Sequence, residues 1–118
     1  MQLIFEKGYE FEECDGLGLV PGKVEKIEAP GMVIPHMGWN KLELRSPSPL
    51  LEGAEGEYVY FVHSFHAEPE DRSIITSVCD YGMEVTASVG RGKVQAFQFH
   101  PEKSSRVGML LLKNFVEL

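Results

Sequence analysis

A histidine and a glutamate stand two residues apart in the segment Gln-Phe-His-Pro-Glu-Lys-Ser, which covers residues 98–104. In extended backbone, residues two apart project to the same side, and Pro101 restricts the backbone between them. A carboxylate bonded to one ring nitrogen fixes the tautomer of an imidazole and makes the other nitrogen more basic. His100 and Glu102 are therefore a candidate general-base pair for activating a thiol or hydroxyl nucleophile. The alternative is an ordinary loop histidine, because the His-x-Glu pattern by itself has low specificity.

A second polar cluster follows the apolar run over residues 58–62. The cluster consists of His63, Ser64 and His66. The Ser64 hydroxyl and the free backbone groups at a strand end could hold a small polar substrate. The competing interpretation is a zinc or iron site built from His63 and His66 together with His100 or Glu102. Neither HExxH spacing nor a cysteine pair supports a metal site, and a turn with solvated histidines is a third interpretation.

The single tryptophan, Trp39, lies in the segment His-Met-Gly-Trp-Asn over residues 36–40. A tryptophan after glycine in a loop is a candidate anchor for a protein interface. Simple packing into the core explains it equally well.

Neither cysteine is a good nucleophile for His100. Cys14 stands among Glu12, Glu13 and Asp15, and neighbouring carboxylates disfavour the reactive thiolate. Cys79 ends an expected strand and lacks the glycines of a nucleophile elbow. Two cysteines are also too few for a disulfide-stabilised secreted domain, so we predict reduced thiols in the cytoplasm.

A fold rich in strands must position these groups. From apolar and alternating patterns we predict strands over 23–28, 32–37, 41–45, 58–62, 74–79, 84–89 and 93–99. Residues 58–62 form a continuous apolar run, typical of a strand buried on both faces, whereas 84–89 alternate as expected for one buried and one wet face. The last strands predict a meander with a glycine-rich turn at 90–92.

A helix is expected at each end of the chain, and a glycine-punctuated loop over 16–22. Residues 1–5 are interpreted as the end of a helix that Gly8 stops. The C-terminal helix follows an apolar stripe with Ser104 or Ser105 as its N-cap. The stripe consists of Val107, Leu110, Leu111, Phe115 and Leu118.

Length and composition bound the possibilities. The 118 residues are 43% hydrophobic and 25% charged, with a formal net charge of −7. This length supports one domain or part of one, and the acidic balance argues against nucleic acid or an anionic membrane as partner. No apolar run approaches the roughly 18 residues of a membrane-spanning helix, and the first residues lack a signal-peptide pattern.

Taken in order, these clusters resemble the class I (triad) glutamine amidotransferases over essentially the whole chain. Segment 98–104 is the most specific match. Segments 16–22 and 35–40 narrow the resemblance to the glutaminase subunits of imidazole glycerol phosphate synthase. The resemblance implies an α/β fold, the C-terminal part of a three-layer α/β sandwich with a mixed sheet, ending in a β-meander and a helix.

The resemblance also assigns roles to individual residues. The last two members of a Cys-His-Glu triad correspond to His100 and Glu102, and no metal or organic cofactor is implied. Four residues correspond to contacts with the substrate glutamine, namely Gln2, Tyr60, Ser64 and Phe65. Five correspond to the surface that faces a (β/α)8-barrel cyclase subunit, namely Met37, Gly38, Trp39, Asn40 and Lys103.

In the family, the nucleophilic cysteine stands in a G-x-C-x-G elbow directly before Met-Gln-Leu, where this sequence begins. We therefore expect residues 1–118 to be a partial domain that lacks the N-terminal strands and the elbow, and to be inactive alone. Self-association or pairing with an N-terminal fragment is the expected consequence of an unpaired sheet edge. Two alternatives stay open: a non-catalytic cyclase-binding subunit, and a metal-dependent β-rich enzyme.

Overall fold

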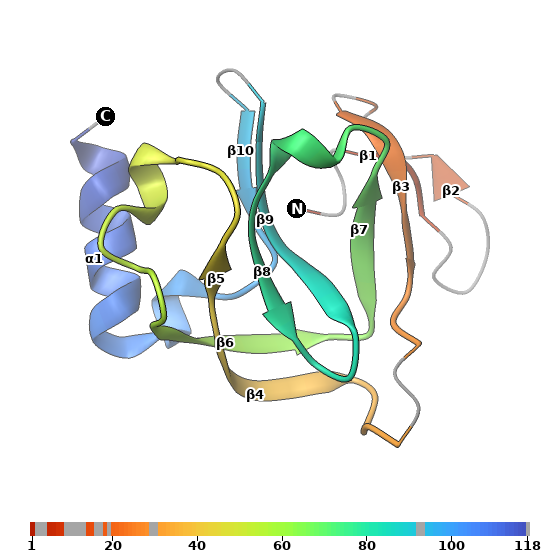
Figure 1. The fold of residues 1–118 in the computed structure, drawn as a ribbon, viewed down its shortest axis with the longest axis horizontal. Coiled ribbons are helices and arrows are strands. Elements are labelled where there is room, and N and C mark those ends of the chain that lie inside the picture. Colours follow the sequence, from red (N-terminus) through yellow and green to blue (C-terminus); the bar gives the residue numbers. More distant parts are fainter. Residues whose placement is uncertain are drawn as a thin grey trace.

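The computed structural model describes residues 1, 5–8, 14–15, 18, 20–28, 31–91 and 94–117. Strands form three sheets, and one α-helix, α1 (Ser105–Val116), closes the described chain (Figure 1). The strands are β1 (Phe5–Gly8), β2 (Cys14–Asp15), β3 (Val20–Lys26), β4 (His36–Lys41), β5 (Glu43–Leu44), β6 (Tyr58–His63), β7 (Phe65–Pro69), β8 (Ile75–Asp80), β9 (Glu84–Arg91) and β10 (Val94–Phe97). The described residues also include three 3₁₀ turns: η2 (Pro49–Leu51), η3 (Arg72–Ile74) and η4 (Pro101–Lys103). Among the described residues, no helix is long and apolar enough to cross a membrane.

The first sheet has the order β2-β1-β3-β7 and mixes parallel with antiparallel pairs. Of the helix expected over 1–5, residues 2–4 lie outside the described residues, and the expectation is wrong at Phe5, because Phe5–Gly8 is a strand that runs parallel to β3. Pairing with β3 outweighs the local pattern, since Phe5 is fully buried in a cluster with Val20 and Val24. The expected loop over 16–22 is also too long, because β3 begins at Val20.

The second sheet confirms the predicted meander, with β8, β9 and β10 as successive antiparallel neighbours and β5 beside β8. The expected wet face of residues 84–89 is wrong, because Thr86 and Ser88 are buried. Hydroxyl partners across the pair make this burial tolerable. The Ser88 Oγ lies 2.6 Å from the Thr76 Oγ1 and 2.5 Å from the Ser77 Oγ.

Strands β4 and β6 form a separate antiparallel pair that runs below the other strands in Figure 1. The expectation that residues 58–62 are buried on both faces is wrong. Val59 and Phe61 are fully buried, whereas Tyr58 is 55% exposed and Val62 is 38% exposed. One face of this two-stranded pair covers the core, and nothing among the described residues covers its other face.

Helix α1 forms where the apolar stripe predicts it and lies at one side of the molecule, with the meander between it and the first sheet (Figure 1). Val107 and Leu111 are buried against a core that includes Phe61 and Phe99, but Phe115 is 63% exposed. Just before the helix, the Ser104 hydroxyl accepts a hydrogen bond from the Tyr60 amide, so the end of the 98–104 segment lies against β6.

Candidate functional site

The candidate base pair forms as the spacing predicts. The His100 Nδ1 lies 2.9 Å from the Glu102 Oε1, and both side chains are exposed at the start of η4. Because a carboxylate only accepts, the proton of a neutral His100 sits on Nδ1, which leaves the Nε2 lone pair free. The arrangement is therefore that of an oriented general base.

Two hydrogen bonds fix the backbone of His100. The His100 amide donates to the carbonyl of Tyr60 on β6 at 3.0 Å. The fully buried Ser104 hydroxyl donates to the His100 carbonyl at 2.6 Å and accepts from the Tyr60 amide at 3.0 Å. Ser104 precedes α1 but makes no side-chain cap. Sequence reasoning assigned Ser104 only a capping role and missed this clamp, which no local pattern would have indicated.

Hydrogen bonds keep the carboxylate of the pair ionised. The Glu102 backbone amide, and then the His100 side chain, hold the pKa of Glu102 below its usual value. The Glu102 carboxylate is therefore charged at neutral pH, beside the His100 Nδ1.

Tyr60 and Trp39 lie opposite each other on the uncovered face of the β4–β6 pair, with ring centroids 6.0 Å apart in an edge-to-face arrangement. Met37 and Trp39 are 60% and 53% exposed, and Met37 faces Val62 across the pair. Core packing as the explanation of Trp39 is therefore wrong, and an interface anchor fits its position. We call Met37, Trp39, Tyr58, Tyr60 and Val62 the outer apolar face.

The other expected interface residues are placed differently. The Asn40 side chain points inward, where it donates to the Asp80 carbonyl at 3.0 Å. Gly38 is half-buried with a φ of 119°, and Lys103 is exposed on η4. The outer apolar face and Lys103 are thus at the surface, whereas the Asn40 side chain links β4 to the end of β8 through the Asp80 carbonyl.

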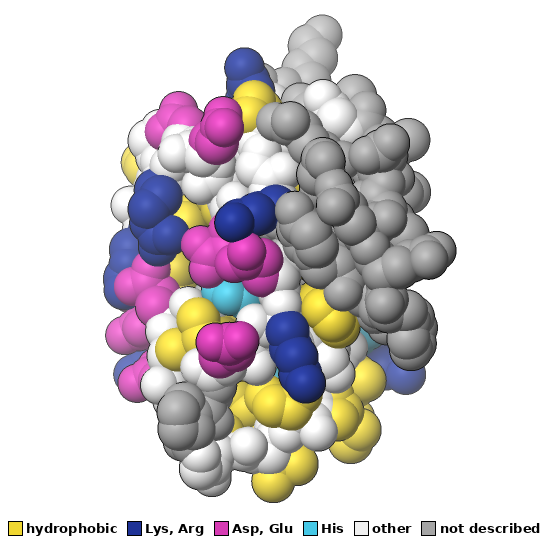
Figure 2. All heavy atoms as spheres, turned by 90° about the vertical axis from the view of Figure 1, so that its right-hand side faces the viewer, with side chains coloured by type: hydrophobic (Ala, Val, Ile, Leu, Met, Phe, Trp, Pro, Cys, Tyr) yellow, Lys and Arg dark blue, Asp and Glu magenta, His cyan; other side chains and the backbone are white. Residues whose placement is uncertain are grey.

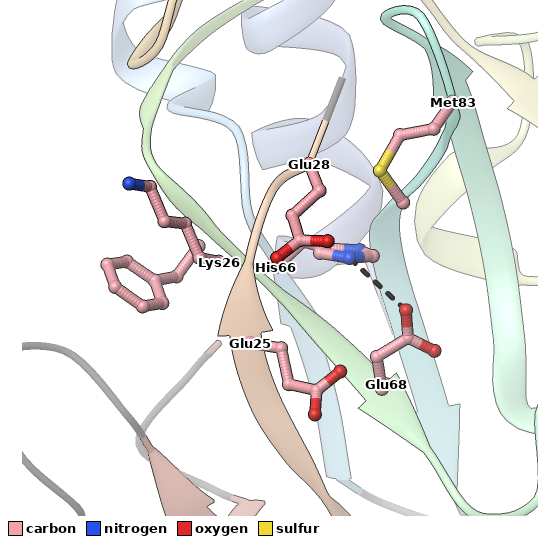
Figure 3. A pocket seen from close by; sticks show the side chains of 7 residues that line it. Glu25, Lys26, Glu28, His66, Glu68 and Met83 are labelled. Atoms are coloured by element: carbon pink, nitrogen blue, oxygen red, sulfur yellow. Dashed lines mark ion pairs between the residues drawn. The ribbon is translucent and has the colours of Figure 1, made fainter. Parts of the chain in front are cut away.

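Ser64 and Phe65 directly follow His63, the last residue of β6, at the bend between β6 and β7. Phe65 lines a hollow of about 730 Å³ together with Glu25, Lys26, Glu28, His66, Glu68 and Met83 (Figure 3). The His66 Nε2 is 3.2 Å from the Glu68 Oε1. Figure 2 shows acidic and basic side chains mixed over this side of the molecule with a histidine among them. Gln2 lies outside the described residues.

Comparison with known proteins agrees with this geometry. The family model described as "Glutamine amidotransferase class-I" matches residues 1–118. The chain belongs to the class I glutamine amidotransferase family. The mixed sheet, the meander and the terminal helix are thus part of the α/β domain of a class I glutamine amidotransferase, as the sequence predicted.

Individual relatives carry a more specific name, "Imidazole glycerol phosphate synthase subunit HisH". The chain is 48% identical to the one from Bacillus cereus (strain B4264) over 116 residues, which are 98% of this chain and 54% of that protein. Identity is 47% over 118 residues to the one from Methanothermobacter thermautotrophicus, covering 100% of this chain and 59% of the relative. For the one from Aquifex aeolicus, identity is 48% over 116 residues, with 98% and 56% covered. The chain spans somewhat more than half the length of these curated relatives.

The metal interpretation finds no support in the geometry of the histidines. Both ring nitrogens of His63 are engaged, one 2.8 Å from the Phe65 carbonyl and the other 3.0 Å from the His36 Nδ1. In the part of the chain that the structure describes, no three His, Cys, Asp or Glu side chains are grouped to hold a metal ion.

Cys79 is fully buried inside the meander of this amidotransferase domain. Burial, with the neighbouring charges of Asp80 and Glu43, raises the pKa of its thiol to about 12. Cys79 is thus unsuited to be the family's nucleophile, as its sequence context predicted. The Cys14 side chain lies outside the described residues.

Proposed function

We propose that this chain serves as the glutaminase part of an imidazole glycerol phosphate synthase, in which it supplies ammonia from glutamine for histidine biosynthesis. The observation that carries the proposal is the His100–Glu102 pair at 2.9 Å, clamped to β6 by Ser104. The family membership and the names of the relatives support the same reaction.

In the proposed reaction, a cysteine thiolate attacks the side-chain amide carbon of glutamine and forms a tetrahedral intermediate. His100 Nε2 takes the thiol proton and passes it to the departing nitrogen, so that the carbon–nitrogen bond breaks and ammonia leaves. Water, deprotonated by His100, then hydrolyses the thioester to glutamate and restores the thiol. Glu102 orients the ring and stabilises its protonated form. Gln2, Tyr60, Ser64 and Phe65 remain the proposed glutamine contacts.

The proposed partner is the barrel-shaped cyclase subunit, which would take up the ammonia. The outer apolar face supports this part of the proposal, because exposed aromatic and methionine side chains are enriched at interfaces. With Gly38, Asn40 and Lys103 beside it, this face would make the chain one half of a cytoplasmic heterodimer that combines hydrolase and lyase chemistry.

We further propose that the 118 residues alone do not hydrolyse glutamine. Cys79 is buried with a raised thiol pKa, and Cys14 stands among carboxylates. A thiolate nucleophile must therefore come from a segment of the kind that carries the G-x-C-x-G elbow in the family.

Fragment complementation tests the proposal. The purified chain is mixed with the cyclase subunit and with a separately expressed N-terminal fragment of a relative that carries the elbow, and glutamate release is measured. We expect no release from the chain alone, release in the three-component mixture, and loss of release with His100→Ala. Glu57→Gln, an exposed carboxylate 3.9 Å from Arg106, is the matched control that keeps activity. Activity that survives His100→Ala would contradict the proposal.

The second candidate is a non-catalytic subunit that binds the cyclase. The outer apolar face favours it independently of the base pair. Binding to the cyclase without glutamate release in any complemented mixture would select this alternative.

A further inference from the structure

His36 and His63 form a buried pair that the proposed reaction does not use. They lie directly opposite each other on β4 and β6, and are 2% and 6% exposed. The His36 Nδ1 is 3.0 Å from the His63 Nε2. The His36 ring is stacked against Phe61 and Tyr81, with centroids 4.7 Å and 4.0 Å away. Because the two rings are buried and packed, the other partners of their nitrogen atoms determine which ring donates the hydrogen bond between them.

The contact between His63 and the Phe65 carbonyl on β7 decides the direction of this hydrogen bond. The Phe65 carbonyl, 2.8 Å from the His63 Nδ1, can only accept, so the proton of His63 is on Nδ1. The Nε2 of a neutral His63 is then a lone pair, and the His36 Nδ1–H donates to it. His36 in turn keeps a lone pair on Nε2.

The opposite end, at Asn40, agrees. The Lys41 amide donates to the Asn40 Oδ1 at 2.7 Å, which turns the Asn40 Nδ2 toward the Asp80 carbonyl at 3.0 Å and the His36 Nε2 at 3.3 Å. The hydrogen bonds therefore run one way, from Asn40 through His36 and His63 to the Phe65 carbonyl. Every donor and acceptor of the two rings is used.

Both rings must be neutral for this chain of hydrogen bonds to exist. Burial lowers the pKa of His36 to about 4, with the charge of His63 adding to the effect. Burial also lowers the pKa of His63, against the Phe65 hydrogen bond. The titratable groups facing the pair are Tyr81 across the His36 ring, and His66 and His100 beside His63.

The two ends belong to different parts of the proposed machinery. Asn40 follows Trp39 on the strand that carries the outer apolar face. Phe65, whose carbonyl ends the hydrogen-bond chain, is the first residue of β7. The preceding residue, Ser64, accepts a hydrogen bond at its carbonyl from the Ile27 amide at 2.9 Å. The hydrogen-bond chain thus joins β4, which carries part of the proposed cyclase-binding face, to the strand end at Ser64 and Phe65, where the proposed glutamine contacts lie.

We propose that His36 and His63 are positioning residues whose one-way hydrogen-bond chain, from Asn40 to the Phe65 carbonyl, holds the Ser64–Phe65 strand end in place relative to β4. The link to glutamine and to the cyclase rests on the proposed function. The hydrogen-bond chain itself does not.

The first test reads the tautomers directly in the 118-residue protein, by ¹⁵N NMR of labelled histidines at neutral pH. We expect His36 and His63 to carry the proton on Nδ1, although a free neutral histidine prefers Nε2. His66 gives an internal contrast, because its Nε2 donates to Glu68 and its proton is expected there. An Nε2–H tautomer at His36 or His63 would overturn the proposal.

The second test changes one end of the chain with an isosteric replacement. In Asn40→Asp the carboxylate requires a proton on the His36 Nε2, so His36 must either reverse its tautomer or become charged. We expect the pKa of His36 to rise by about 1 to 3 units and the backbone amide resonances of Ser64 and Phe65 to shift with it. Asn114→Asp is the matched control, since Asn114 donates to the carbonyls of Leu50 and Glu52.

The positioning role would be refuted if Asn40→Asp left the pKa of His36 unchanged. It would also be refuted if the amide resonances of Ser64 and Phe65 did not shift in this variant. Should Asn40→Asp fail to fold, the wild-type tautomers decide alone. Adding L-glutamine to the chain mixed with the N-terminal fragment tests the proposed function separately. The stated tautomers and coupling without any response to glutamine would establish the chain of hydrogen bonds and contradict the glutaminase proposal.

Discussion

The amide of His100 donates to the carbonyl of Tyr60 at 3.0 Å, so the candidate base is hydrogen-bonded to β6, one of the two strands that carry the outer apolar face. The Tyr60 side chain packs edge-to-face with Trp39, while the Tyr60 carbonyl accepts the hydrogen bond from the His100 amide. A partner that docks on this face would therefore press on the strand to which the base is attached.

Trp39→Ala should weaken binding of the cyclase subunit by about 2 kcal/mol or more, because a half-exposed tryptophan beside Tyr60 has the character of an interface hot spot. Titration calorimetry with the purified cyclase measures the effect. The matched control is Phe115→Ala, an aromatic residue on α1 with comparable exposure. Equal loss from both variants would show that the face is not specific.

Glu102→Gln should lower kcat for glutamine hydrolysis in the complemented mixture by about 10²- to 10⁴-fold. The variant keeps the shape of the side chain but removes the charge that stabilises a protonated His100. Steady-state glutamate release measures it, with Glu57→Gln as the control. A kcat within about twofold of the wild type would remove Glu102 from the mechanism.

Ser88→Ala should destabilise the domain by about 1 to 3 kcal/mol, because the buried hydroxyls of Thr76 and Ser77 lose the partner that they share. Urea unfolding monitored by circular dichroism gives the change. Ser73→Ala removes an exposed hydroxyl that contacts Asp71 and should cost less than about 1 kcal/mol. The reverse order would mean that the hydroxyl cluster does not stabilise the meander.

The same cluster explains where sequence reasoning failed. Residues 84–89 alternate polar and apolar side chains, which predicts a wet face, but hydroxyls are small enough to be buried when they bond one another. The prediction for residues 58–62 was wrong in the opposite direction. A continuous apolar run predicts two buried faces, but one face of β6 stays uncovered. Composition alone does not tell which face a neighbouring strand will cover.

Local patterns did predict the groups that depend on local geometry. The His100–Glu102 pair follows from spacing across a proline, and α1 follows from its stripe. The Ser104 clamp and the His36–His63 chain were beyond sequence reasoning, since each depends on which strands pair. Phe5 shows the same limit, because only pairing with β3 makes its segment a strand.

Lowering the pH should destabilise the fold through His36. The ring is neutral in the native state with a pKa of about 4, against 6.5 for an ordinary histidine, so the unfolded state binds more protons between these values. Its contribution is fully present above about pH 6.5 and is lost as the pH falls toward 4, up to about 3 kcal/mol. Urea unfolding at a series of pH values measures the slope.

His36→Asn should flatten that slope, because an amide does not titrate. A His36→Asn protein with an unchanged slope would assign the acid sensitivity to other groups.

Gly108→Ala should destabilise the domain although alanine is the better helix former. A Cβ at this position would lie 1.8 Å from the Pro101 carbonyl oxygen and 3.3 Å from the Ser104 Cβ, so α1 must move away from η4. The clash should outweigh the gain of about 1 kcal/mol in helix propensity and leave a net loss of about 1 to 3 kcal/mol. Because η4 carries Glu102, and Ser104 clamps His100, the displacement should also lower glutamate release in the complemented mixture. Met109→Ala, on the exposed side of the same turn, is the control for both measurements. Stability and activity that both survive Gly108→Ala would show that the contact between α1 and η4 does not hold the base in place.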